Sequence, residues 1–185
     1  MYLIVGLGNP ENEYAHTRHN MGFDTINEIA KNNNISITKT KFKGLYETGI
    51  IQGEKVILLK PQTFMNLSGE SVKEIVDFYN IEPEKIIVIY DDIDTEKGNI
   101  RIRKKGGPGS HKGMISVINE LKIEDFTRIR VGIGQPEHKN DMINYVIGKI
   151  PEDEEKILMQ GVKKAAEAVE EIIKNGTDIA MNKFN

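Results

Sequence analysis

Apolar residues follow two different spacings along the chain, and each spacing predicts its own kind of element. Short runs rich in Ile, Leu and Val are typical of strands buried in a sheet. We predict strands at residues 2–7, 45–51, 55–59, 85–90, 99–103 and 128–134. The second and third of these flank Gln52-Gly53-Glu54, so we expect them to form a β-hairpin.

Other stretches carry apolar residues three or four positions apart, the spacing of a helix with one buried face. We predict helices at residues 21–31, 67–79, 114–121 and 151–173. Because strands alternate with helices and no linker or repeat interrupts them, we expect one α/β domain over residues 1–185. Its sheet is expected to be twisted, mixed and mostly parallel, with helices flanking it.

The charge of the chain is low overall but unevenly placed. The 185 residues include 25 basic and 28 acidic side chains, a net charge of −3, which excludes a uniformly basic nucleic-acid-binding protein. Residues 97–113 nevertheless carry six basic and no acidic side chains, whereas residues 151–171 carry seven acidic and three basic ones. Such a basic segment suits a phosphate backbone, although lysines that protect a solvated strand edge from aggregation give the same pattern.

The absence of cysteine excludes a disulfide framework, a thiolate nucleophile and a cysteine-bound zinc ion. The apolar run at residues 86–90 is far shorter than the ~20 residues of a membrane-spanning helix. No basic segment precedes the first apolar run, so a secretory signal is not expected. We therefore expect a cytoplasmic protein that does not enter a membrane.

Two polar residues directly follow predicted strands, where open α/β sheets place their ligands. Asn9 lies in the turn Gly6-Leu7-Gly8-Asn9-Pro10-Glu11. This is not a dinucleotide fingerprint, since Glu11 stands where the third glycine is needed. Asp91 follows the strand at 85–90 and could orient a catalytic histidine, or it could belong to a solvated acidic turn.

Histidine is the second kind of candidate. His16 and His19 have the spacing of half a metal site. His111 and His138 are remote in sequence and show no ligand spacing, so no metal is expected. The imidazole of His19 suits a general base near neutral pH, whereas a lone histidine is equally compatible with a surface or helix-capping role.

Two loops are candidates for substrate contacts. The glycine-rich loop at 106–113 is not a phosphate loop, because a histidine precedes Lys112 and a glycine follows it. It permits close approach of a ligand, or it is simply a mobile connection. In the segment 63–69, Asn66 or Ser68 is predicted to be the N-cap of a helix, and Phe64 precedes it as a packing or stacking group.

Taken together and in this order, these segments resemble bacterial peptidyl-tRNA hydrolases over nearly the whole chain. The matching segments are residues 3–10, 14–22, 60–69, 91–94, 106–113 and 126–134. The resemblance implies a compact α/β monomer that cleaves the ester between a peptide and the 3′-terminal ribose of tRNA, and so recycles tRNA from stalled or aborted translation. It also implies that neither a metal nor a cofactor takes part.

The resemblance also gives roles to residues at matching positions. His19 is then the general base that activates water, and Asp91 orients and polarises His19. Asn9 helps to distinguish a blocked α-nitrogen from a free amine, while Asn66 and Lys112 contact the substrate near the ester. Lysine departs here from the asparagine usual in the family, and because it offers only donors it could bind a phosphate or an oxyanion but could not accept a hydrogen bond.

Contacts with tRNA are implied in the same way. Tyr14 and Phe64 match positions that contact the tRNA end. The basic residues expected to meet tRNA phosphates are Arg103, Lys104, Lys105, Arg130 and Lys139.

Two other functions are compatible with these features. A non-catalytic RNA-binding relative would use the basic segment but would not need His19, Asp91, Asn9 and Asn66 together. A hydrolase or phosphorylase of small nucleosides would keep the α/β fold but would not need the basic segment. The combination of both features favours the ester hydrolase.

Overall fold

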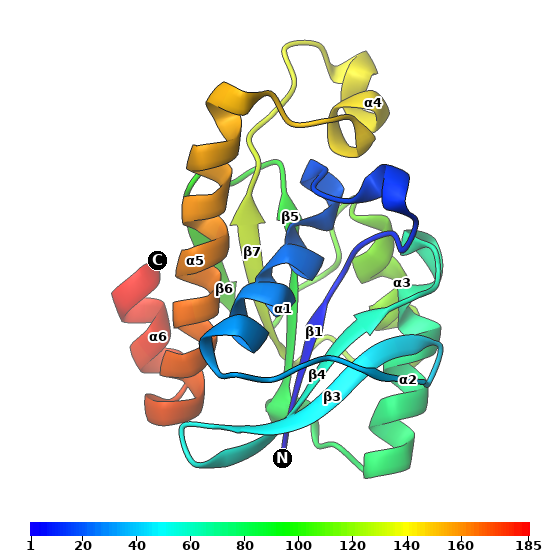
Figure 1. Ribbon diagram of the computed structural model, residues 1–185, viewed down its shortest axis with the longest axis vertical. Helices are drawn as coiled ribbons and strands as arrows, with labels where there is room; N and C mark the ends of the chain where they lie inside the picture. Colours follow the sequence, from blue (N-terminus) through cyan, green and yellow to red (C-terminus); the bar gives the residue numbers. More distant parts are fainter.

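The centre of the protein is a seven-stranded sheet with the strand order β2-β3-β4-β1-β5-β7-β6 (Figure 1). In the computed structural model, which describes residues 1–185, the strands are β1 (Tyr2–Gly6), β2 (Lys39–Lys41), β3 (Gly44–Ile51), β4 (Glu54–Pro61), β5 (Ile86–Asp92), β6 (Ile100–Arg103) and β7 (Thr127–Gly132). The four central strands β4, β1, β5 and β7 are parallel. The β2–β3, β3–β4 and β6–β7 pairs are antiparallel, which confirms the mixed sheet and the hairpin.

Helices cover both faces of this sheet (Figure 1). The α-helices are α1 (Met21–Asn32), α2 (Ser68–Tyr79), α3 (Lys112–Leu121), α4 (Met142–Ile147), α5 (Glu152–Asn175) and α6 (Thr177–Phe184). Short 3-10 helices are η1 (Asn12–Tyr14), η2 (Arg18–Asn20), η3 (Met65–Leu67), η4 (Pro83–Lys85) and η5 (Lys139–Asp141). One apolar cluster packs the sheet against α1, α5 and α6, and a second packs it against α2 and α3.

Burial on both faces of the sheet explains why the middle of β1 is apolar at successive positions. In β1, Ile4 belongs to the cluster under α1 and α5, whereas Leu3 and Val5 belong to the cluster under α2 and α3. All three side chains are fully buried. Successive residues of a strand face opposite sides of its sheet, so a strand covered on both sides requires an uninterrupted apolar run.

Three short elements have no counterpart among the predicted ones. β2, α4 and α6 contain 3, 6 and 8 residues, too few for an apolar spacing to repeat. The helix expected at 67–79 begins at Ser68 with Leu67 at its N-cap position, so the expectation of Asn66 or Ser68 as N-cap is wrong. The reason is that η3 leads directly into α2, and the Ser68 hydroxyl donates instead to the Met65 carbonyl at 2.8 Å.

Close packing of α1 against β1 fixes the segment that carries His19. A Cβ atom on Gly6 would lie 2.1 Å from the Gly22 carbonyl oxygen, and one on Gly22 would lie 2.4 Å from the Leu7 nitrogen. Two glycines therefore allow the first turn of α1 to contact the end of β1 directly. This contact places η2, which immediately precedes α1, at the carboxyl end of the sheet.

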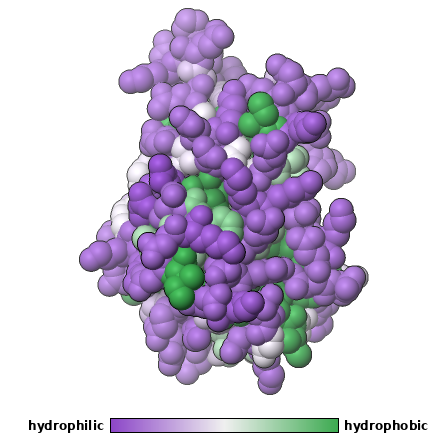
Figure 2. All heavy atoms as spheres, turned by 90° about the vertical axis from the view of Figure 1, so that its left-hand side faces the viewer, coloured by the Kyte–Doolittle hydropathy of each residue, from purple (hydrophilic) through white to green (hydrophobic).

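No helix combines the length and the apolar character needed to cross a bilayer. The face that carries α5 and α6 is largely hydrophilic, with apolar atoms in small separate spots (Figure 2). The amino end of α5 is acidic, with Glu152, Asp153, Glu154 and Glu155 in its first turn, where the helix dipole favours negative charge.

Candidate active site

A cleft of about 430 Å³ lies at the carboxyl ends of the central strands. The loop after β1 contributes Asn9, η2 contributes His19, and the end of β5 contributes Asp91. Segments that are distant in sequence meet here because β1 and β5 are parallel neighbours and end at the same edge. Asn9 and Asp91 each lie at the carboxyl end of a strand, as the sequence predicted, and the structure brings these two ends together.

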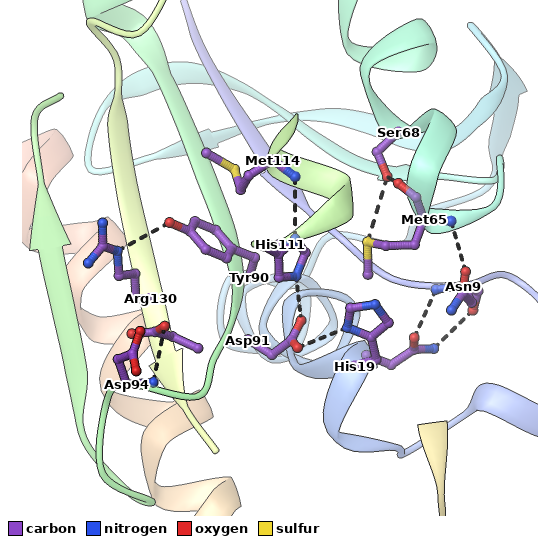
Figure 3. A network of polar contacts seen from close by, with 12 residues as sticks. Asn9, His19, Met65, Ser68, Tyr90, Asp91, Asp94, His111, Met114 and Arg130 are labelled. Atoms are coloured by element: carbon purple, nitrogen blue, oxygen red, sulfur yellow. Dashed lines mark hydrogen bonds and ion pairs between the residues drawn. The ribbon is translucent and has the colours of Figure 1, made fainter. Parts of the chain in front are cut away.

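The carboxylate of Asp91 holds two imidazole rings (Figure 3). Its Oδ2 atom lies 2.9 Å from His19 Nδ1, and its Oδ1 atom lies 2.8 Å from His111 Nε2. Asp91 is buried, and its two histidine partners are largely buried. Sequence spacing sets His111 apart from His19, but the ring centroids are only 5.1 Å apart. His111 therefore belongs to the site, although sequence reasoning did not include it.

Hydrogen bonding fixes the protonation of these rings. The backbone N–H of Met114 donates to His111 Nδ1 at 3.3 Å, so this nitrogen is an acceptor and Nε2 carries the proton. An ionised carboxylate only accepts, so His19 Nδ1 also donates to Asp91. The remaining nitrogen of His19, Nε2, is left with a free lone pair. His19 lines the cleft, as a general base requires.

The charges of the pair support each other. Burial opposes ionisation of Asp91, but His111 and His19 outweigh it and hold the pKa of Asp91 well below its ordinary value. Burial also lowers the pKa of His19, yet the charge and hydrogen bond of Asp91 outweigh that effect and raise the pKa above 6.5. Asp91 therefore stays ionised and strengthens His19 as a base.

His19, Asp91 and His111 also have the composition of a two-histidine, one-carboxylate metal site, with donor atoms within 4.8 Å of one another. A metal ion needs a lone pair on each ligating nitrogen. His111 Nε2 carries a proton while Nδ1 accepts the Met114 N–H. A metal ion on Nε2 would move the ring proton to Nδ1, and Nδ1 could then no longer accept the Met114 N–H. The hydrogen bonding therefore suits proton transfer better than metal coordination.

The side-chain amide of Asn9 is oriented by the backbone (Figure 3). Its Oδ1 atom accepts the N–H of Met65 at 2.8 Å, which assigns the NH₂ group to the side that faces the cleft. Asn20 holds the Asn9 backbone through two bonds, accepting its N–H at 2.8 Å and donating to its carbonyl at 2.9 Å. Asn20 is buried next to His19, and sequence reasoning gave it no role.

Four of the remaining predicted residues line the same cleft, namely Phe64, Asn66, Lys112 and Arg130. Phe64 is 51% exposed, so its ring is available to a ligand. Arg130 donates from Nε to the Tyr90 hydroxyl at 3.2 Å. Tyr14, in η1, and Lys139, in η5, do not line the cleft.

The basic residues of the edge strand lie outside the cleft. In the β6–β7 pair, Arg103 is opposite Arg128 and Arg101 is opposite Arg130, so four arginines share one face. Arg128 is fully buried and donates to the Gly106 carbonyl at 2.6 Å, which anchors the start of the glycine-rich loop. Arg130 lines the cleft, and Arg101 and Arg103 extend the positive charge from it onto the edge strand β6.

Lys104 and Lys105 line a separate polar hollow together with Glu84, Asp125 and Asp178. The Lys104 ammonium pairs there with the Asp178 carboxylate. These two lysines are thus placed among acidic residues, unlike Arg103, which has no acidic partner and donates to the Ile102 carbonyl at 3.0 Å.

One wall of the cleft is apolar and comes from α4. Its residues are Met142, Ile143, Val146 and Ile147. In Figure 1, α4 lies beyond the carboxyl ends of β5 and β7. Sequence reasoning missed this wall because α4 is only 6 residues long. A cleft with one apolar side and several fixed polar groups is typical of a site that orients an organic substrate.

Comparisons with known proteins bear on this geometry. The family model described as peptidyl-tRNA hydrolase matches residues 3–185. The peptidyl-tRNA hydrolase of Clostridium beijerinckii is 55% identical over 185 residues, which covers 100% of this chain and 96% of that one.

Solved structures give the same result. The crystal structure of peptidyl-tRNA hydrolase from Acinetobacter baumannii matches with a TM-score of 0.93 at 38% identity, covering 99% of this chain and 93% of that one. A uridine phosphorylase from Vibrio fischeri matches with a TM-score of 0.51 at 13% identity, covering 93% of this chain and 90% of that one, and this likeness shows a related fold alone. Because the family model and the similar relative both extend over the length of the sequence, the chain belongs to the peptidyl-tRNA hydrolase family.

Proposed function

We propose that this protein cleaves the ester between peptide and tRNA with a water molecule that His19 activates as a general base. Hydrolysis of peptidyl-tRNA follows from membership of the family. The observation that supports the mechanism is the 2.9 Å contact between His19 Nδ1 and Asp91, which leaves His19 Nε2 as the free base in the cleft. An ester has a good leaving group, so water and one base are sufficient without a covalent nucleophile.

The proton moves in two steps. Water gives a proton to His19 Nε2 as its oxygen attacks the ester carbonyl, and Asp91 stabilises the imidazolium that forms. The carbonyl π electrons move onto oxygen, and donors from Asn66 and Lys112 stabilise that oxyanion. When the tetrahedral intermediate collapses, the C–O bond to the ribose breaks and His19 returns the proton to the departing ribose oxygen. The peptide carboxylate and tRNA are the products.

Asn9 gives this reaction its requirement for a blocked substrate. Its NH₂ group faces the cleft because its oxygen accepts the Met65 N–H. A donor at this position binds the carbonyl oxygen of the peptide bond that blocks the α-nitrogen. The free ammonium of an ordinary aminoacyl-tRNA offers only donors, so Asn9 has nothing to bind.

The tRNA lies, in this proposal, along the edge of the sheet next to the cleft. Phe64 and Tyr14 contact its 3′ end, and Arg103, Arg130 and Lys139 bind its phosphates. Lys104 and Lys105 join them only after Lys104 leaves its acidic partner Asp178. The whole chain then acts as a single-domain monomer in the cytoplasm.

The decisive experiment compares the native protein with His19→Ala on N-acetyl-aminoacyl-tRNA, with unblocked aminoacyl-tRNA as the control substrate. We expect the variant to lose turnover while it still binds tRNA in a filter or anisotropy assay. Full turnover by His19→Ala contradicts the mechanism. A native protein that binds tRNA without cleaving it identifies a non-catalytic RNA-binding relative, and cleavage of free nucleosides identifies the nucleoside enzyme.

A further inference from the structure

The residue directly before His19 makes an unusual set of contacts away from the cleft. Arg18 Nη1 donates to the Tyr145 carbonyl at 3.0 Å, and its guanidinium carbon lies 3.9 Å from the centroid of the Tyr145 ring. Arg18 Nη2 bonds the Glu154 carboxylate. The Arg18 side chain is only 10% exposed. One short 3-10 helix thus carries His19 towards the cleft and Arg18 towards α4 and α5.

Glu154 extends these contacts to the other half of the catalytic pair. While one of its oxygens bonds Arg18, the other bonds Lys97, which lies in the loop that follows Asp91 and β5. Burial raises the pKa of Glu154, but the hydrogen bonds and charges of Lys97 and Arg18 together outweigh burial and hold the pKa below its ordinary value, so Glu154 remains ionised. A single carboxylate therefore holds the segment of His19 and the segment that follows Asp91.

Tyr145 links the same contacts to the wall of the cleft. It belongs to α4, whose apolar side chains form that wall. The Tyr145 hydroxyl donates to the Ile133 carbonyl, just beyond β7. A β-bridge between Thr17 and Lys149 joins the residue before η2 to the segment that follows α4. Arg18 is therefore connected to His19 through η2 and to the apolar wall of the cleft through Tyr145.

We propose that Arg18 is a positioning residue for the hydrolysis: its contacts with Tyr145 and Glu154 hold His19 against Asp91 and α4 against the cleft as one unit. This inference rests on the proposed function of His19 as the base. The role requires a guanidinium, because its plane stacks on the Tyr145 ring while two separate nitrogens donate to Tyr145 and Glu154, whereas a lysine ammonium has no planar group to stack.

The test uses Arg18→Lys, which keeps the charge and removes the stacking. Since small displacements of a catalytic group reduce rates strongly, we expect kcat on N-acetyl-aminoacyl-tRNA to fall about 10- to 100-fold. We also expect the acid limb of the pH profile of kcat/KM to move to lower pH, because His19 is held less closely by Asp91. A purely structural role would lower the melting temperature without moving this limb.

A second variant keeps the inference testable if Arg18→Lys folds poorly. Tyr145→Leu removes the ring together with the hydroxyl bond to the Ile133 carbonyl but leaves the backbone carbonyl and Glu154 in place, and we expect it to raise KM more than it lowers kcat. The kcat of the double variant is expected to be no lower than that of Arg18→Lys alone, because both substitutions remove the same stacking contact. The matched control is Lys85→Met, which removes a cation 4.3 Å from the ring centroid of Tyr2 and is expected to leave kcat and the pH profile unchanged.

Two results overturn the inference. One is a folded Arg18→Lys protein with native kcat and a native acid limb. The other is a double variant whose loss is the full product of the two single losses. His19→Ala, measured in parallel, separates the two levels: an active His19→Ala protein refutes the mechanism itself, whereas an inactive one beside a fully active Arg18→Lys protein refutes only the positioning role.

Discussion

His111 Nδ1 accepts the backbone N–H of Met114 at 3.3 Å, and this bond at the start of α3 determines which nitrogen of His111 is protonated. The proton on Nε2 is donated to Asp91, whose other oxygen accepts from His19. A helix N-cap thus sets the tautomer of His111 and so supplies a donor to the carboxylate that holds His19. The geometry leads to five predictions.

The first concerns the donor that His111 supplies to Asp91. His111→Leu removes it and leaves one carboxylate oxygen unsatisfied, so we expect kcat to fall about 10-fold, the scale of one hydrogen bond to a charged group. His111→Gln offers an amide N–H in its place and is expected to retain most of the activity. Equal losses in the two variants, measured by single-turnover deacylation, would show that the donor is not what matters.

The second concerns pH. Burial lowers the pKa of His19, but the charge and the hydrogen bond of Asp91 together outweigh burial and raise the pKa above its ordinary value, so kcat/KM is expected to fall as the pH drops through this raised pKa. Asp91→Asn removes the charge, so the limb is expected to move to lower pH. The plateau rate is expected to fall about 10³- to 10⁴-fold, as when a histidine loses its orienting carboxylate. A pH profile with an unmoved limb contradicts the pairing.

The third concerns substrate choice. Asn9→Asp keeps an oxygen to accept the Met65 N–H but replaces the NH₂ group that faces the cleft with an acceptor. We expect cleavage of N-acetyl-aminoacyl-tRNA to fall about 100-fold, since an unpaired polar contact costs about 1–3 kcal/mol. The ratio of blocked to unblocked cleavage is the quantity to measure. Asn9→Ala serves as the control, because it removes the donor without adding an acceptor.

The fourth concerns the basic residues beside the cleft. Arg103→Gln and Arg130→Gln each remove one proposed phosphate contact, so each is expected to weaken tRNA binding and to reduce the slope of log K against log salt by about one. Lys163→Gln, on the exposed side of α5, is the matched control and is expected to leave the slope unchanged. Slopes identical to that of the native protein would place the tRNA elsewhere.

The fifth concerns stability. In Gly6→Ala, the new methyl group would meet the Gly22 carbonyl oxygen at 2.1 Å, and overpacking of this kind costs about 1–3 kcal/mol. We expect a lower free energy of unfolding in urea and a loss of activity as α1 is displaced. Gly107→Ala, with no atom within 4 Å of its added Cβ, is expected to change stability by less than about 0.5 kcal/mol.

Much of the sheet could be predicted because its central strands are short apolar runs rich in Ile, Leu and Val, a composition that favours strands over helices. The run at 85–90 becomes β5, and the carboxylate that follows it, Asp91, reaches the cleft as expected. Asn9 and His19 could be assigned because each stands in a segment that matches the family. The positions of these residues are set by short segments of sequence, so a motif along the chain is enough to predict them.

The remaining part of the site depends on contacts between remote segments. His111 reaches Asp91 only because the glycine-rich loop returns to the sheet, and no periodicity describes such a loop. Arg18 and Asn20 stand beside His19, but their partners Glu154 and Asn9 lie elsewhere in the sequence. A pattern along the chain reveals which residues are apolar or charged, and it does not reveal which of them will meet.

The central position of β1 has a consequence for how the protein acquires its activity. Leu3 pairs with Ile57 of β4 on one side and with Ile86 of β5 on the other. Parallel pairing between such distant segments is slow to form, because the long connections between them must close. Asn9, His19 and Asp91 come together only after those closures. A nascent or partly refolded chain therefore has no rudimentary catalytic site, and hydrolysis begins only when the central sheet is complete.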